Sequence, residues 1–120
     1  MTPSQIVTAD LKKRGVDPKR ELIQLEKAVK IAHAIVLQED NTIMVLLPLS
    51  KDSAEIKMYS TDTPLSIISA VSVFIKKLKN SDIKKIYFNA TSQQNVATMQ
   101  KLGVQVANSD KKGYNAMAIL

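Results

Sequence analysis

The 120-residue sequence contains no cysteine, no tryptophan, three glycines and one histidine. Without cysteine, neither a disulfide bond nor a thiolate metal site can form within the chain. The single histidine, His33, cannot alone supply a metal cluster or the nucleophile and base pair of a hydrolase. Gly15, Gly103 and Gly113 are too far apart for a dinucleotide-binding fingerprint or a P-loop. The sequence thus lacks the common motifs of metalloenzymes, nucleotide hydrolases and dinucleotide-dependent enzymes.

The sequence also lacks long apolar runs. No stretch reaches the roughly 18 apolar residues that a membrane-spanning helix needs, and the amino terminus has no basic region followed by an apolar one. We therefore expect a cytoplasmic protein without membrane contact. A length of 120 residues and an apolar content of 45% predict a single domain over residues 1–120 with one hydrophobic core.

Basic residues outnumber acidic ones. The chain has 17 Lys and Arg against 11 Asp and Glu, which gives a formal net charge of +6. This balance favours contact with an anionic partner but does not identify one. The charges lie in short clusters: Lys12, Lys13 and Arg14; Lys19 and Arg20; Lys76, Lys77 and Lys79; Lys84 and Lys85; Lys111 and Lys112.

Two helices are predicted at the amino terminus. The first begins at Pro3 with Thr2 as its cap, and Gly15 terminates it. The second covers residues 18–32, where apolar residues recur at intervals of three and four. Short apolar runs are ambiguous between helix and strand, so this helix could also continue through Val36.

Three strands follow, at residues 34–37, 42–47 and 54–59. The first two are continuous apolar runs rich in β-branched residues, and a polar turn separates them. Pro48 cannot donate to a strand ladder, so it should end the second strand or lie at its edge. In the third, alternation of apolar and polar residues indicates one buried face. Short turns predict that the three strands form an antiparallel meander.

The second half of the chain predicts two helices and three strands. A broad apolar stripe marks a helix from Pro64, capped by Thr63, to Lys79, and a strand follows at residues 84–89. Ser92 can cap a helix that Gly103 ends, and residues 104–107 and 114–120 read as a closing hairpin. The fold class is α/β (α+β): a mixed, mostly antiparallel sheet with helices on both faces.

This order of elements, α-α-β-β-β-α-β-α-β-β, resembles the GCN5-related N-acetyltransferase fold over nearly the whole chain. The most specific part is the strand that ends in Asn89, followed by a helix whose last turn contains Lys101 and Gly103. The resemblance implies acetyl-coenzyme A as cofactor. It places cofactor contacts at Ser60, Thr61 and Asn89, and a general base at Glu55.

The sequence departs from that family where the family binds pyrophosphate. There, a glycine-rich turn presents free backbone N–H groups at the start of the helix. Here, residues 59–64 contain no glycine, Pro64 removes a donor, and Asp62 adds a negative charge. The tyrosine that often serves the family as general acid is replaced by Met99. An outward-facing carboxylate such as Glu55 is also most often only solvated.

Over residues 55–120, the chain combines an acetyltransferase-like order of elements with a cofactor-binding turn that has lost its glycines. In this combination it resembles the acetyltransferase-like internal virion proteins of short-tailed bacteriophages. This resemblance implies a structural protein in a host cytoplasm or virion, with no cofactor and with other proteins of an assembly as partners. We therefore expect a catalytically inactive domain that acts by protein-protein interaction.

Two alternatives stay open: a divergent acetyl-coenzyme A-dependent N-acetyltransferase, and a basic module with weak contact to nucleic acid. The second lacks aromatic platforms for base stacking, since the chain has two Phe and three Tyr. The sequence leaves the oligomeric state undetermined. The candidate interaction surfaces are the amino-terminal helix, through Ile6, Leu11, Lys12, Lys13 and Arg14, and a basic corner formed by Lys76, Lys77, Lys84 and Lys85.

Overall fold

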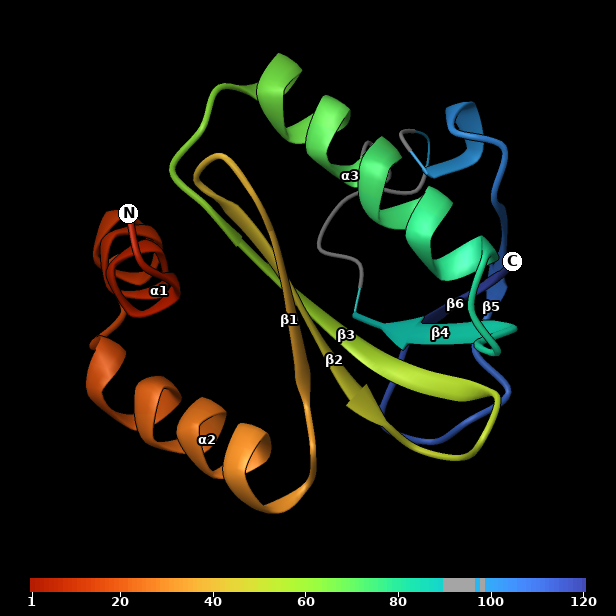
Figure 1. Cartoon of the computed structure of the whole chain (residues 1–120), viewed down its shortest axis with the longest axis horizontal. Helices are drawn as coiled ribbons and strands as arrows, with labels where there is room; N and C mark the ends of the chain where they lie inside the picture. The colour runs from red at the N-terminus through yellow and green to blue at the C-terminus, as the bar shows by residue number, and fades with distance from the viewer. Residues whose placement is uncertain (90–96, 98) are drawn as a thin grey trace.

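A computed structural model describes residues 1–89, 97 and 99–120 (Figure 1). Its helices and strands follow in the order α1 (Pro3–Lys13), α2 (Pro18–Ile31), β1 (Ile35–Glu39), β2 (Thr42–Pro48), β3 (Ser53–Ser60), α3 (Pro64–Lys79), β4 (Lys85–Phe88), β5 (Gln105–Asn108) and β6 (Ala116–Ile119). This order confirms the predicted fold class. The predicted helix at residues 92–102 lies largely outside the described residues, although residues 99–101 are helical.

The strands form one six-stranded sheet in the order β1-β2-β3-β4-β6-β5. Every neighbouring pair is antiparallel except β3 and β4, which are parallel and joined by α3. A parallel pair needs a crossover, and a helix that packs on the sheet is the usual one. The predicted meander and closing hairpin are both confirmed. Pro48 ends β2, as predicted, and lies opposite Ala54.

The helix starts agree with their capping residues. In α1, Thr2 and Gln5 form a reciprocal capping box, and in α3 the side chain of Thr63 accepts from the Ser66 backbone N–H at 3.4 Å. The alternative in which α2 continued through Val36 is wrong. The helix ends because His33 adopts a left-handed conformation with φ of 59°, and β1 then begins.

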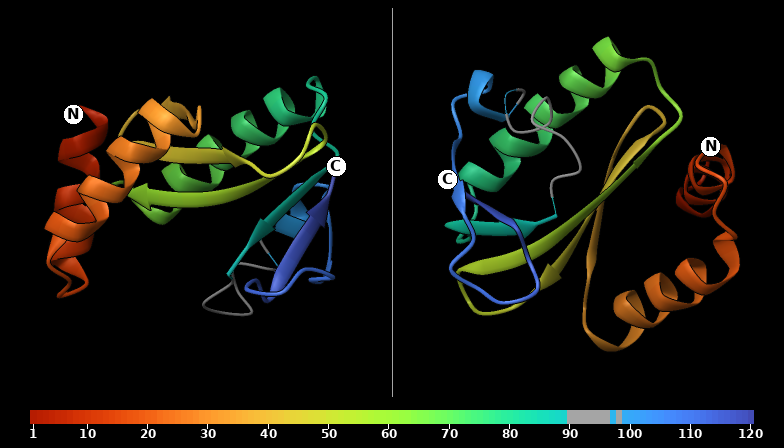
Figure 2. Two further views of the ribbon diagram at one scale, coloured as in Figure 1. Left: turned by 90° about the horizontal axis from the view of Figure 1, so that it is seen from below. Right: turned by 180° about the vertical axis from the view of Figure 1, so that it is seen from behind.

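The helices cover both faces of the sheet, as predicted: α1 and α2 lie on one side of β1–β3 and α3 lies on the other (Figures 1 and 2). The face under α3 carries the larger core, in which Phe74, Met44, Ile86 and Ala118 are fully buried. A second cluster on the opposite face joins Ile6 and Val7 of α1 to residues of β2 and β3. The sheet therefore divides the expected single core into two.

Candidate functional site

Strands β3 and β4 pair at their beginnings and then separate. Residues Ser53, Ala54 and Glu55 pair with Lys85, Ile86 and Tyr87, whereas β3 continues to Ser60. Within the described part of the chain, no strand residue pairs with β3 on this side beyond Glu55. Among the residues that the structure describes, the longer strand thus presents an unpaired edge next to the separation point.

The backbone of Met58 points its N–H and C=O toward this edge. The Thr61 N–H donates to the Asn41 carbonyl and the Leu49 N–H donates to the Ser53 carbonyl, so odd-numbered residues of β3 bond to β2. Since bonding directions alternate along a strand, Met58 faces the other way. An extended ligand chain with amide groups could pair with such an edge as a strand does.

The carboxylate of Glu55 lies at the point where the two strands separate. It is half-buried on the face opposite α3, beside Tyr87 in the register of β3 and β4. The phenol of Tyr114, from the loop before β6, donates to Glu55 Oε2 at 2.8 Å. Burial, and secondly this hydrogen bond, raises the pKa of Tyr114 to about 12. Glu55 is therefore held in place rather than merely solvated.

A second phenol–carboxylate pair lies next to the first. Tyr87 donates to Asp110 Oδ1 at 2.8 Å, and Lys85 Nζ donates to Asp110 Oδ2 at 3.3 Å. The hydrogen bond from Tyr87, followed by that from Lys85, lowers the pKa of Asp110. The rings of Tyr87 and Tyr114 are 5.6 Å apart, and Lys111 Nζ lies 5.7 Å from the Tyr87 ring centre. These contacts hold the loop between β5 and β6 against the sheet.

Asn89 forms hydrogen bonds to the same loop between β5 and β6. Its side-chain Nδ2 donates to the Gly113 carbonyl at 3.3 Å, and its Oδ1 accepts from the Asn115 N–H at 3.0 Å. In this structure the side chain of Asn89 thus positions the segment that carries Tyr114. Its role as a cofactor contact stays a prediction.

The turn between β3 and α3 uses its backbone N–H groups within the protein. The Ser60 N–H donates to Asp10 Oδ2 at 2.9 Å, the Thr61 N–H to the Asn41 carbonyl at 3.1 Å, and the Asp62 N–H to Ser60 Oγ at 3.0 Å. Anion sites at helix starts depend on N–H groups that are free to point at the ligand. Three successive N–H groups here are already occupied.

The Asp62 carboxylate is fixed at this turn. Its Oδ2 accepts from the Asn41 N–H at 3.1 Å and from the Thr42 hydroxyl at 2.7 Å. The negative charge therefore stays beside the start of α3, where Pro64 has no N–H to offer. A pyrophosphate at this turn would meet one carboxylate and few donors, as the sequence predicted.

Asp10 is a contributor that the sequence analysis missed. It is 7% exposed, and besides Ser60 it accepts two hydrogen bonds from the Arg14 guanidinium, at 2.9 and 2.7 Å. A signal was present: Asp10 falls on the apolar stripe of its helix, beside Ile6 and Leu11, and a carboxylate there needs partners. Asp110 and Tyr114 gave no comparable signal, because their partners lie far away in the sequence.

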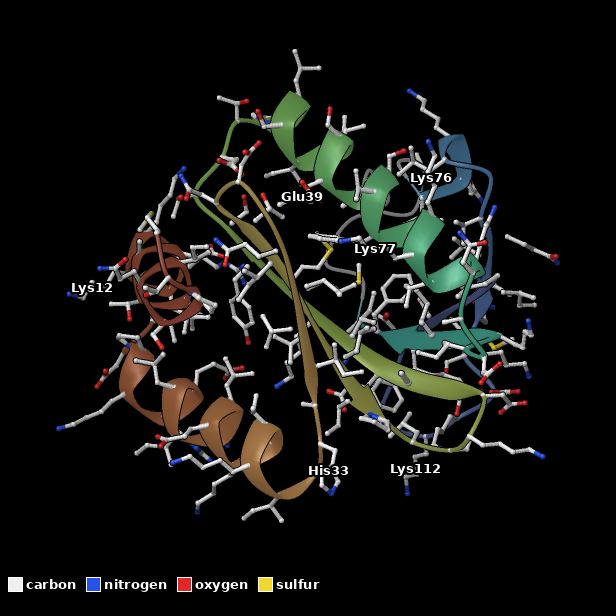
Figure 3. All side chains as sticks on the ribbon, in the orientation of Figure 1. Lys12, His33, Glu39, Lys76, Lys77 and Lys112 are labelled. Atoms are coloured by element: carbon white, nitrogen blue, oxygen red, sulfur yellow. The ribbon has the colours of Figure 1, made fainter. Side chains whose placement is uncertain are left out.

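The other residues singled out in the sequence lie elsewhere. Met99 is buried in the core under α3, so it fills space rather than facing a ligand. His33 projects from the end of α2 (Figure 3). No group of three His, Asp or Glu side chains that could hold a metal ion is found among residues 1–89, 97 and 99–120.

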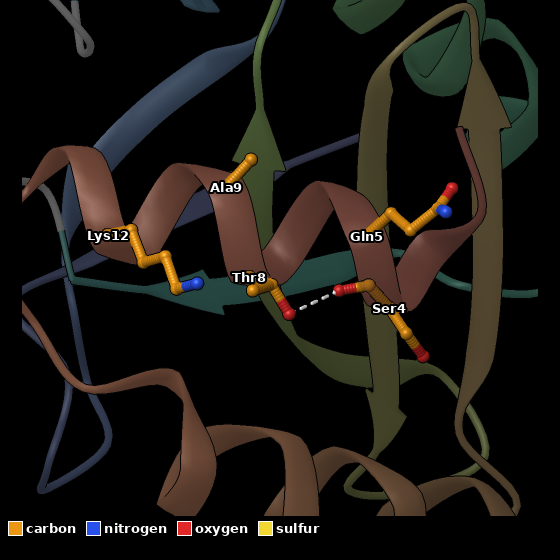
Figure 4. Close-up of a pocket in the computed structure, with 5 residues that line it drawn as sticks. All are labelled: Ser4, Gln5, Thr8, Ala9 and Lys12. Atoms are coloured by element: carbon orange, nitrogen blue, oxygen red, sulfur yellow. Dashed lines mark hydrogen bonds between the residues drawn. The ribbon is translucent and has the colours of Figure 1, made fainter.

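The predicted interaction surface on α1 needs correction. Ile6 and Leu11 are 0% and 6% exposed, because their stripe packs against β2 and β3. Exposed and half-buried residues of α1 instead line a shallow depression, formed by Ser4, Gln5, Thr8, Ala9 and Lys12 (Figure 4). Within it, the Thr8 hydroxyl donates to the Ser4 carbonyl at 2.8 Å. Lys12, Lys13 and Arg14 remain exposed.

The basic corner is partly neutralised. The Nζ atom of Lys77 lies 3.9 Å from Oε1 of Glu39 in β1, and Lys85 forms an ion pair with Asp110. Lys76 and Lys84 are exposed, and in Figure 3 Lys76 and Lys77 both lie on α3, with Lys77 on the side toward Glu39. The residues of this corner thus belong partly to the loop contacts described above, and its role as an interaction surface stays a prediction.

No helix among the described residues combines the length and the apolar character that crossing a bilayer requires. No family model matches the sequence. No curated protein matches it.

Solved structures show which fold this is. An acetyltransferase from Streptococcus agalactiae superposes with a TM-score of 0.62 at 10% identity, covering 97% of this chain and 88% of that one. A GNAT family acetyltransferase from Elizabethkingia anophelis with acetyl-CoA bound gives 0.55 at 20% identity, covering 100% and 89%. Tetrahymena GCN5 gives 0.59 at 13% identity, covering 98% and 84%. The chain has the GCN5-related N-acetyltransferase fold.

Proposed function

From this fold, we propose that the chain binds a coenzyme A thioester along the unpaired edge of β3 and transfers its acyl group to an amine. The observation that carries the proposal is the separation of β3 and β4 beside a half-buried carboxylate, Glu55. The Elizabethkingia anophelis structure of the same fold contains acetyl-CoA. This proposal corresponds to one of the two alternatives that the sequence left open, the divergent acetyltransferase.

The chemistry assigns different roles to Glu55 and Tyr114. The amine nitrogen attacks the thioester carbonyl, the carbon–sulfur bond breaks, and Glu55 accepts the proton that the nitrogen loses. The thiol that is conjugate to the leaving thiolate resembles that of cysteine, with a pKa of roughly 8.5, whereas the pKa of Tyr114 is raised to about 12. Proton transfer from so weak an acid to the thiolate is uphill. Tyr114 therefore positions Glu55, and the thiolate takes its proton from the solvent.

The turn between β3 and α3, whose N–H groups are already hydrogen-bonded, predicts how the cofactor is held. Because Ser60, Thr61 and Asp62 use their N–H groups internally and Asp62 is charged, the phosphates contribute little to binding. Isothermal titration should give similar dissociation constants for acetyl-coenzyme A and for S-acetylpantetheine, which lacks the diphosphate. Asp62→Asn should tighten the binding of acetyl-coenzyme A and leave that of S-acetylpantetheine unchanged.

Release of free thiol in the presence of peptide amines measures the transfer. Glu55→Gln should reduce the rate by about 10²- to 10⁴-fold, the usual contribution of a general base. Tyr114→Phe should reduce it less, and Glu39→Gln, which changes a carboxylate of β1, should leave it unchanged. A Glu55→Gln variant as active as the parent protein would exclude this base.

A second candidate is a catalytically silent domain that acts by binding other proteins, and the occupied β3–α3 turn is the observation that favours it. It predicts that neither acetyl-coenzyme A nor S-acetylpantetheine binds, so the same titration separates the two candidates. The resemblance to phage virion proteins stays a prediction, since the solved structures described above are acetyltransferases. Contact with nucleic acid likewise stays a prediction.

A further inference from the structure

The outer surface of α2 carries a single row in which cations alternate with apolar side chains. Lys19, Ile23, Lys27 and Ile31 follow at intervals of four, so they form one ridge along the helix. All four are exposed, and Ile23 and Ile31 keep 52% and 74% of their surface in contact with solvent. The helix contains no fully buried residue. Its inward side, through Leu22 and Leu25, packs only partly on the second core.

The cations of this ridge are not neutralised within the chain. Both acids of α2 bind partners other than the ridge cations: Glu21 accepts from Lys57 and Tyr59 of β3, and Glu26, beside the ridge, pairs with Lys30 at 2.7 Å. Across the described residues, Lys19 and Lys27 form no ion pair. The same holds for Arg20, on the adjacent row. The ridge is therefore both cationic and apolar.

We propose that this ridge docks a helix of a partner protein whose facing row alternates acidic and apolar residues at the same spacing of four. Rows of this kind on two helices interdigitate, which would bury Ile23 and Ile31 and place carboxylates against Lys19 and Lys27. The ridge lies on the side of α2 that faces away from the sheet, so the inference holds whether or not the chain transfers acyl groups.

Three other occupants fit the ridge less well. A second copy would leave the cations unneutralised, because the same ridge, which contains no acidic residue, would supply both partners. Nucleic acid would satisfy the cations but leave Ile23 and Ile31 against phosphates. A bilayer surface favours helices with a continuous apolar face and aromatic side chains, whereas α2 turns Leu22 and Leu25 inward and contains no aromatic residue.

The experiment is an NMR titration of the full chain at low salt with two synthetic helical peptides of identical composition. One alternates Glu and Leu along a single row of spacing four, and the other carries the same residues in scrambled order. The first should shift the amide signals of α2, and the second should bind about tenfold more weakly or not at all. Equal binding of the two peptides, or no shift of α2 signals, would overturn the proposal.

Variants of the protein sharpen this test. Lys27→Glu should weaken binding of the alternating peptide by about tenfold or more, and a peptide with Lys in place of the facing Glu should restore it. Ile23→Ser should also weaken it. Lys51→Glu makes the same charge change in the exposed β2–β3 turn and should have no effect. If Lys51→Glu weakens binding as much as Lys27→Glu does, the attraction is nonspecific and the proposal fails.

The competing occupants are tested in the same way. Phosphatidylglycerol vesicles or duplex DNA that bind through α2 while the alternating peptide does not would overturn the proposal. Self-association in sedimentation equilibrium that Lys27→Glu abolishes would overturn it in favour of a second copy. All four residues of the ridge are exposed, so these variants should keep the circular dichroism spectrum of the parent protein.

Discussion

The two faces of the sheet differ in what covers them. Under α3, apolar side chains from nearly every strand meet five buried residues of one helix, and the core is continuous. On the other face, α1 and α2 cover β1, β2 and the end of β3, and beyond them polar side chains continue along β3 and β4. One face therefore carries the larger core, whereas the other carries a smaller core and the polar side chains of the proposed site.

A single strand shows how both faces arise. In β3, Ala54, Ile56 and Met58 point toward α3, and the odd-numbered residues point to the opposite face. Of the latter, Glu55 accepts from Tyr114, Lys57 donates to Glu21, and Tyr59 donates to the same carboxylate. No buried polar side-chain atom of the described residues lacks a partner. Hydrogen bonds thus hold the polar side chains of this face, beside its smaller core.

The largest effect is expected in the core under α3. Phe74 is fully buried, and Phe74→Ala should lower the free energy of unfolding by about 3–5 kcal/mol through lost burial and a cavity. Leu65→Ala, on the same helix but 80% exposed, should change it by less than about 0.5 kcal/mol. Urea denaturation measures both. Similar losses for the two variants would mean that α3 is not the main source of burial.

A smaller effect is expected where α1 meets the β3–α3 turn. Asp10→Ala leaves the Ser60 N–H without its acceptor and should cost about 2 kcal/mol in unfolding free energy. Glu26→Ala removes an exposed carboxylate of an ion pair on α2 and should produce no measurable change. If Asp10→Ala were equally silent, the turn would not depend on α1, and its N–H groups would be more available to a ligand.

The smallest effect concerns acid stability. For Glu21, burial raises the pKa, but the hydrogen bonds from Tyr59 and Lys57 outweigh it, and the pKa is lowered from 4.5. A carboxylate whose folded-state pKa is lowered stabilises the fold above its unfolded value, and this contribution is lost as the pH falls through the folded value. Glu21→Gln should therefore make stability less dependent on pH below 4.5.

Chemical denaturation at a series of acidic pH values measures this dependence. Tyr59→Phe keeps the carboxylate but removes one of the hydrogen bonds that lower its pKa, so it should flatten the profile in part. A Glu21→Gln profile parallel to that of the parent protein would show that another group controls acid stability.

Much of the architecture could be predicted from the sequence because local rules specify it. The predicted caps Thr2 and Thr63 mark two helix starts, and in the structure each of them caps its helix. The main error, a surface role for Ile6 and Leu11, arose because a narrow apolar stripe does not show which part of the sheet will cover it. The end of α2 was ambiguous for a similar reason, since a left-handed His33 leaves no pattern in the residues around it.

The candidate site was predictable only in part. Alternation along β3 identified Glu55 as facing away from the buried side of the strand, and the composition of residues 59–64 indicated a poor phosphate site. The partners were not predictable: Tyr114 is 59 residues from Glu55, and Asp10 is 50 residues from Ser60. The periodicity of apolar residues indicates which face of a strand or helix a residue lies on. Contacts between residues far apart in the sequence depend instead on how the strands and the final loop fold back on one another.

The sequence alone determined the order of helices and strands, the apolar side of each, and the lack of glycine at the β3–α3 turn, because these properties depend on neighbouring residues. Only the tertiary structure decided where β3 and β4 separate, that Tyr114 holds Glu55, and that the N–H groups of the turn are already bonded. These features require segments distant in the chain to meet, and the geometry of that meeting is set by packing the whole sheet.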